Sequence, residues 1–175
     1  NQQSTEITDC SFIRNKTTRE PSYAGALWYG CGTIVSPDAE YTFTGGPITC
    51  SLLMQNCLFY DNESKLLGGG AHFVSGGTAS VVNCTFVQNR ASYANGSRGD
   101  GGGLSNNDID LTLMNCTFAQ NYAGGQGGGF ALNSNNPNTT QIYNTIFSFN
   151  VSNNGGSTGY EDVRDNCDET LLGNN

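Results

Sequence analysis

The sequence predicts an all-β protein, a right-handed parallel β-helix of about five to six coils with one disulfide-bracketed insertion. Three observations predict it: five copies of the motif Asn-Cys-Thr-Phe-x-x-Asn, glycine runs between the copies, and a composition with 24 Gly and few helix-forming residues. A repeat of about thirty residues with two strand-like runs and a glycine turn is typical of a β-solenoid. A leucine-rich repeat would need a leucine ladder, and a propeller blade would need a longer period with four strands. The sequence has neither.

The copies of the motif define the coils. Their phenylalanines stand at positions 12, 59, 86, 118 and 147, so the intervals are 47, 27, 32 and 29 residues. We interpret the last three intervals as single coils with loops of different length, and the first as a coil that carries an insertion at about 28–50. The whole chain, 1–175, is then one β-helix domain, with a closing coil at about 141–175.

The side-chain pattern before each phenylalanine predicts a bend. The fifth residue before it is apolar in every copy: Ile7, Met54, Val81, Leu113 and Ile142. Two residues five positions apart cannot share one face of a flat strand, because side chains alternate with a period of two. The chain must bend between them, and the Asn-Cys pair is the expected corner, since asparagine tolerates the left-handed conformation.

Stacked coils place equivalent residues about 4.8 Å apart, so the motif predicts columns of identical side chains. We expect a phenylalanine stack, an aliphatic stack and two asparagine ladders, in which each amide is both donor and acceptor. One ladder contains Asn56, Asn83, Asn115 and Asn144, and the other contains Asn62, Asn89, Asn121 and Asn150, with Asn15 at its start.

Composition excludes several classes of partner. The chain has 7 Lys+Arg and a net charge of −8, with the basic residues scattered singly, which argues against nucleic acid and against anionic lipid surfaces. It has no apolar run long enough to span a bilayer. Its 7 cysteines favour an oxidising compartment, so we expect an extracellular or cell-surface protein.

The cysteines fall into two groups. Cys31 and Cys50 bracket the insertion and are the predicted disulfide, which would close a loop of about twenty residues and stabilise it by roughly 3 kcal/mol. Cys10, Cys57, Cys84 and Cys116 share one repeat position, where a column of small buried residues is expected. No metal site is predicted, because the chain has no CxxC motif and one histidine. The partners of these four cysteines and of Cys167 stay open.

Seven Asn-x-Ser/Thr sequons make N-linked glycosylation possible. No cofactor is expected. The sequons begin at Asn15, Asn62, Asn83, Asn95, Asn115, Asn138 and Asn150. A ladder motif rich in asparagine and threonine also produces sequons by chance, and an amide buried between coils cannot carry a sugar. Asn95 and Asn138 lie in the longest polar loops and are therefore the best candidate acceptors.

Carboxylates come close together in the sequence at two places. One group contains Asp100, Asp108 and Asp110, and the other contains Asp162, Asp165 and Asp168. Both lie in predicted loops, which favours solvated acids over a catalytic site, and their spacing gives a structural calcium ion no support. We therefore predict no catalytic residues.

The alternation of Phe-x-x-Asn with Gly-Gly-Ala, Gly-Gly-Leu or Gly-Gly-Phe resembles the repeats of chlamydial polymorphic outer-membrane proteins and related β-helical surface proteins. The resemblance covers about residues 5–163, and Gly-Tyr-Glu-Asp-Val at 159–163 looks like the closing coil of such arrays. It implies a right-handed parallel β-helix used for display or adhesion, with no catalytic residues. The insertion departs from that pattern.

The expected function follows from repeats that lack a predicted end cap. A non-enzymatic extracellular rod is the leading hypothesis, stacked end to end with copies of itself or set among the flanking coils of a larger surface filament or adhesin. One alternative is an adhesin segment that binds a host or carbohydrate partner through loops 90–100 and 133–140. Another is a pectate-lyase-like enzyme that degrades polysaccharides.

Overall fold

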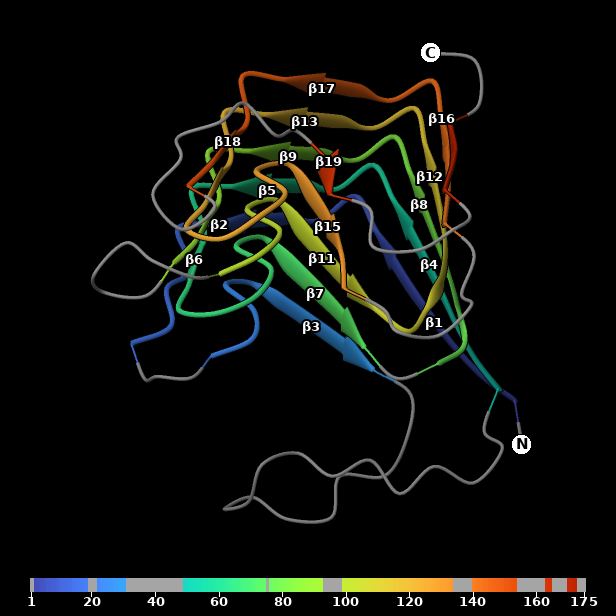
Figure 1. Ribbon diagram of the computed structural model, residues 1–175. Helices are drawn as coiled ribbons and strands as arrows, with labels where there is room; N and C mark the ends of the chain where they lie inside the picture. Colours follow the sequence, from blue (N-terminus) through green and yellow to red (C-terminus); the bar gives the residue numbers. More distant parts are fainter. Residues whose placement is uncertain are drawn as a thin grey trace.

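The computed structural model describes residues 2–18, 22–30, 49–74, 76–92, 99–133, 140–153, 163–164 and 170–172. In this part of the chain every regular element is a β-strand, and none of the residues is helical. No helix long and apolar enough to cross a membrane is found among these residues. The strands form four parallel sheets, which Figure 1 shows as successive faces of the molecule.

Each sheet takes at most one strand from a repeat. Sheet A contains β1 (Gln2–Thr8), β4 (Thr49–Gln55), β8 (Thr78–Val82), β12 (Asp110–Met114), β16 (Thr140–Tyr143) and β20 (Thr170–Leu172). Sheet B contains β2 (Ser11–Ile13), β5 (Leu58–Tyr60), β9 (Thr85–Val87), β13 (Thr117–Ala119) and β17 (Ile146–Ser148). Sheet C contains β6 (Glu63–Ser64), β10 (Arg90–Ala91), β14 (Tyr122–Ala123) and β18 (Val151–Ser152). Sheet D contains β3 (Leu27–Gly30), β7 (Ala71–Val74), β11 (Leu104–Asn107), β15 (Phe130–Leu132) and β19 (Val163–Arg164).

Every strand pairs in parallel with the equivalent strand of the next repeat. In sheet B the five phenylalanines of the motif are partners in one register, and in sheet A the five apolar residues from Ile7 to Ile142 are likewise in register. The all-β parallel architecture predicted from the repeats is confirmed, and it is compatible with a parallel β-solenoid.

The core is built from the predicted columns. The rings of Phe12, Phe59, Phe86 and Phe118 stack with successive centroid distances of 4.6 Å, and Phe118 stacks on Phe147 at 5.0 Å. This spacing matches the distance between neighbouring strands, since each ring sits one strand above the last. The aliphatic column lies beside it, and a third apolar set comes from sheet D through residues such as Phe73, Leu104 and Phe130.

The chain turns between sheets A and B at the predicted corner. The five corner residues all have left-handed φ angles between 46° and 54°: Asp9, Asn56, Asn83, Asn115 and Asn144. A second left-handed corner, between sheets B and C, is formed by Arg14, Asp61, Gln88, Gln120 and Phe149, with φ angles between 54° and 57°. The second corner was not predicted, because arginine, aspartate, glutamine and phenylalanine at one repeat position give no recurring turn signal.

The glycine runs make the turn between sheets C and D. Gly101 has a φ of +70°, which L side chains rarely adopt. At Gly102 the limit is space: a Cβ atom would lie 2.3 Å from the carbonyl oxygen of Gly128 in the next repeat. The run therefore lets two backbones pass closer than any side chain would permit.

The strands on either side of the predicted insertion, about 28–50, are described by the structure. Residues 28–30 belong to β3, which pairs in register with β7, and residues 49–50 belong to β4, so the segment between these strands is 31–48. Segment 31–48 lies outside the described residues. Within the predicted closing coil, about 141–175, β20 pairs with β16 and so stands one repeat further along sheet A.

Replacing Gly102 by alanine should destabilise the protein by about 3 kcal/mol, since neighbouring backbone must move to make room. Gly76 is the control: its φ is +73° but an added Cβ would meet nothing within 4 Å, so Gly76→Ala should cost only about 1 kcal/mol. Urea denaturation of the two variants measures the difference. Equal losses would show that close approach between repeats is not the constraint at Gly102.

Candidate functional site

The second asparagine column is a continuous chain of buried hydrogen bonds between sheets B and C. Asn62, Asn89, Asn121 and Asn150 are fully buried. The Oδ1 atom of Asn89 accepts from the backbone N–H of Asn62 at 3.1 Å and from its Nδ2 at 2.8 Å. The same pair of bonds joins Asn89 to Asn121 and Asn121 to Asn150. Each amide thus binds the previous repeat through its oxygen.

The nitrogen of each amide binds in both directions along the column. The Nδ2 atom of Asn89 donates to Asn121 and also to the carbonyl oxygen of Phe59 at 2.9 Å. One side chain therefore joins three successive repeats. A carboxylate could not donate these bonds and a hydroxyl could not make all of them, so the position requires an amide.

The first column, at the corner between sheets A and B, points outward and is exposed. Asn56 donates to Asp9 at 3.0 Å, and Asn83 donates to Asn56 at 3.4 Å. Asn115 and Asn144 continue the column in position. These residues serve the left-handed corner more than they serve a hydrogen-bonded ladder.

The structure divides the sequons by exposure. Asn62 and Asn150 are buried in the ladder, so the folded chain cannot carry a glycan there. Asn15, Asn83 and Asn115 are exposed, and the threonine of each corner sequon follows in sheet B. Asn95 and Asn138 lie outside the described residues.

The four repeat cysteines form a column of free thiols, in which Cys57, Cys84 and Cys116 are buried and Cys10 is half-buried. Burial raises the pKa of Cys84 to about 12, and it also raises the pKa values of Cys57 and Cys116. Thiols with such pKa values are protonated and unreactive at neutral pH, which suits a structural role. Cys50 is disulfide-bonded; Cys31 and Cys167 lie outside the described residues, so the pairing of Cys31 with Cys50 stays a prediction.

The first group of carboxylates is divided between two turns. Asp100 precedes the glycine turn, where its Oδ1 accepts from the backbone N–H of Gln126 at 2.7 Å. Asp108 lies in the turn that follows β11, and Asp110 is the first residue of β12 in sheet A. Asp162, Asp165 and Asp168 lie outside the described residues. Within the described ranges no three His, Cys, Asp or Glu side chains come close enough to hold a metal ion.

His72 lies buried on the outward-facing side of sheet D, beneath the ring of Tyr23. Burial lowers its pKa from 6.5 to about 4, although a hydrogen bond to the backbone of Ser105 opposes the shift. The imidazole is therefore neutral at pH 7. Its Nδ1 atom has no hydrogen-bond partner.

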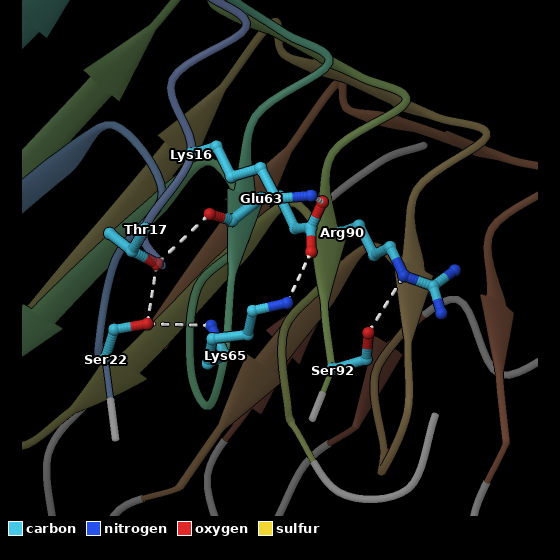
Figure 2. A network of polar contacts seen from close by, with 7 residues as sticks. All are labelled: Lys16, Thr17, Ser22, Glu63, Lys65, Arg90 and Ser92. Atoms are coloured by element: carbon cyan, nitrogen blue, oxygen red, sulfur yellow. Dashed lines mark hydrogen bonds and ion pairs between the residues drawn. The ribbon is translucent and has the colours of Figure 1, made fainter. Parts of the chain in front are cut away.

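Sheet C carries a polar network on its outer face, shown in Figure 2. The residue after each ladder asparagine points outward here, and neighbouring strands align these residues as Lys16, Glu63, Arg90, Tyr122 and Val151. Lys16 and Lys65 bind the two carboxylate oxygens of Glu63 at 2.5 Å and 2.8 Å. We call Lys16, Glu63, Lys65, Arg90 and Tyr122 the sheet C cluster.

The electrostatics of the cluster disfavour a role for Glu63 as a general acid. Partial burial raises the pKa of Glu63, but the hydrogen bonds and charges of Lys16 and Lys65 outweigh burial and lower it overall. Glu63 is therefore ionised at neutral pH and has no proton to give. Three cations against one carboxylate leave the cluster with a charge of +2, in a chain with a net charge of −8. The cluster is suited to binding an anion.

Sequence reasoning missed this cluster, although a signal for it exists. The residue that follows each ladder asparagine is the outward position of sheet C. Comparing that position across the repeats places two of the seven basic residues, Lys16 and Arg90, in one column. Two cations that stand far apart in the sequence therefore lie in one column, on either side of Glu63.

Replacing Asn89 by alanine should destabilise the protein by at least about 3 kcal/mol, because two donors of Asn62 and the carbonyl of Phe59 lose their buried partner. Asn83→Ala, at the exposed corner, should cost about 1 kcal/mol. Thermal and urea unfolding measure both. Similar values for the two variants would contradict a stabilising ladder.

His72 makes stability depend on pH. Its pKa is about 4 when folded, below the value of 6.5 for a free histidine, so the unfolded chain binds the proton more tightly. Stability is complete above pH 6.5 and should fall by about 2 kcal/mol between pH 7 and pH 5 from this residue alone. Urea unfolding of wild type and His72→Gln at the two pH values isolates that contribution. An identical pH dependence in both proteins would contradict it.

Comparison of the chain with protein-family models, with curated proteins and with solved structures finds no match. The assignment of this site therefore depends on the residues and contacts of the chain itself.

Proposed function

We propose that the chain is a non-enzymatic extracellular structural protein, a rod of right-handed parallel β-helix that stacks end to end with copies of itself or with flanking coils of a larger surface protein. The observation that carries the proposal is the set of columns that repeat from one end of the described structure to the other. Columns of this kind can be extended by any further coil that brings the same residues.

Among the described strands, β1 is the last strand of sheet A at the first repeat, and this edge supports stacking. β1 pairs with β4 on one side, and Gln3, Ser4, Thr5 and Glu6 of β1 are exposed. Phe12 is half-buried and Asn15 is exposed, whereas Phe59 and Asn62 in the next repeat are fully buried. An additional coil placed on this edge would bury the phenylalanine ring and supply partners to the strand.

Two features support the finer description of the rod. Connections between parallel strands of one sheet are right-handed in about 98% of cases, which favours right-handed coils. The disulfide at Cys50 supports an insertion that is tied to the body of the rod.

The chemistry of the described side chains supports a structural role over an enzymatic one. His72 is neutral and buried, Glu63 is neutralised by two lysines, and the thiols of the cysteine column are protonated. Each of these groups is occupied in holding the fold. We also propose an extracellular location, because the disulfide at Cys50 is typical of an oxidising compartment.

Thr5→Lys should abolish stacking between copies. Thr5 faces the core side of β1 and pairs in register with the buried Leu52, so a lysine there would place a charge inside the junction. Ser4→Lys adds the same charge on the outward side of the same strand and should leave stacking unchanged. Sedimentation velocity and negative-stain electron microscopy over a concentration series measure the particle length.

Wild type and Ser4→Lys should lengthen with concentration while Thr5→Lys stays short. Short monodisperse wild-type particles at every concentration would contradict stacking between copies. Equal lengthening of all three proteins would show that the β1 edge is not the junction.

A further inference from the structure

Arg90 is held in one orientation from two sides. Its Nε atom donates to the Oγ atom of Ser92 at 2.8 Å, and Ser92 is fully buried. Its guanidinium carbon lies 4.1 Å from the centroid of the Tyr122 ring, on the neighbouring strand. Figure 2 shows the side chain turned toward Ser92 and away from the lysines. A cation stacked on an aromatic ring and anchored at Nε has lost most of its rotational freedom before any ligand arrives.

The free edge of this guanidinium is the edge that binds oxyanions. Of the three guanidinium nitrogens, Nε alone has a hydrogen-bond partner in the described part of the chain, and Arg90 is exposed. The two terminal nitrogens remain, and they present parallel N–H groups whose spacing matches the two oxygens of a carboxylate. Arg90 can therefore bind a carboxylate end-on without breaking a contact.

The rest of the cluster makes the surroundings favourable for an anion. Lys65 is largely buried and fixed, because its ammonium group binds Glu63 and its backbone N–H donates to Ser22. Lys16 is more than half exposed and uses one of its donors on Glu63. Because the two lysines neutralise Glu63, its charge does not repel a ligand at the neighbouring Arg90. Thr17 and Ser22 add hydroxyl groups beside the cations.

Arg14 shows that this arrangement is not a general property of exposed arginines here. Arg14 is 73% exposed and its charge is directed to Asp61 at 3.4 Å. It belongs to the corner between sheets B and C in the first repeat. It therefore serves as a matched control for Arg90, with the same charge and without the aromatic support.

We propose that the sheet C cluster binds an acidic saccharide, with Arg90 taking the carboxylate of a uronate end-on. The net charge of −8 on the chain disfavours long polyanions such as nucleic acid, and favours a short ligand that is recognised locally. A uronate holds its carboxylate on a rigid ring and offers hydroxyl groups for the neighbouring side chains, so little entropy is lost on binding. In an oligouronate each sugar carries one carboxylate, so a chain lying across the strands reaches Arg90 and Lys16 together.

The site lies on a lateral face of the molecule and does not depend on end-to-end stacking. The test uses the full chain, with Thr5→Lys as a background if stacking complicates the measurement. Binding of tetragalacturonate is followed by NMR titration and calorimetry in wild type, Arg90→Gln, Arg90→Lys and Arg14→Gln. Neutral galactotetraose, a sulfated disaccharide and a tetraglutamate peptide are the comparison ligands. Circular dichroism confirms that each variant is folded.

Tetragalacturonate should bind wild type and perturb the signals of residues 16, 63, 65, 90 and 122, while the neutral sugar should not bind. Arg90→Gln should weaken binding at least about tenfold, Arg90→Lys should weaken it nearly as much, and Arg14→Gln should change it less than about twofold. Binding should also weaken as salt is added.

Five results would overturn the proposal. Three of them are no binding of tetragalacturonate to wild type, equal binding of the neutral sugar, and an equal loss of affinity in Arg14→Gln, which would indicate unspecific charge. Tighter binding of tetraglutamate is the fourth, and it would assign the site to an acidic peptide. Tighter binding of the sulfated disaccharide is the fifth, and it would show that the site prefers a sulfate to the carboxylate of a uronate.

Discussion

Hydrogen bonds between the asparagine amides buried in successive repeats set the register on which the rest of the structure depends. Toward the repeat before it, Asn89 accepts from Asn62 through Oδ1 and donates from Nδ2 to the carbonyl of Phe59. Toward the repeat after it, its Nδ2 and backbone N–H both donate to Asn121. A slip of one residue in any repeat would leave several of these buried groups without partners. The same register brings the phenylalanine rings into their stack.

The turns allow each repeat to stack on the previous one at the distance that separates neighbouring strands of a sheet. Two corners use the left-handed backbone conformation, and the third uses glycine to let backbones pass closely. A corner that recurs at the same place in every repeat allows the side chains on either side of it to stay in column. This explains why a chain so rich in glycine and asparagine forms an ordered core instead of a flexible coil.

The structure separates positions that hold the repeats together from positions that are free to vary. Inward residues are the same or similar in every repeat, whereas the outward residues of sheet C change from lysine to glutamate, arginine, tyrosine and valine. Variation is tolerated there because those side chains meet solvent and no neighbouring layer. The outward face is therefore where a ligand can be recognised without disturbing the stack, and the cluster of Arg90, Lys16 and Lys65 uses that freedom.

The sequence by itself determined the all-β class, the parallel stacking, the phenylalanine and aliphatic columns and the corner at the Asn-Cys pair. These features recur at each repeat, so a pattern of five copies contains enough information to predict them. It did not determine the second left-handed corner, where Arg14 and Phe149 share a conformation and no chemistry, or the ends of the inserted segment, where Trp28 and Tyr29 belong to a regular strand. Only the tertiary structure decided which sequons are buried, that Asp100 is separated from Asp110, and that Arg90 rests on Tyr122 from another repeat. Those properties depend on which residues of different repeats lie side by side, and unequal loop lengths hide that alignment in the linear sequence.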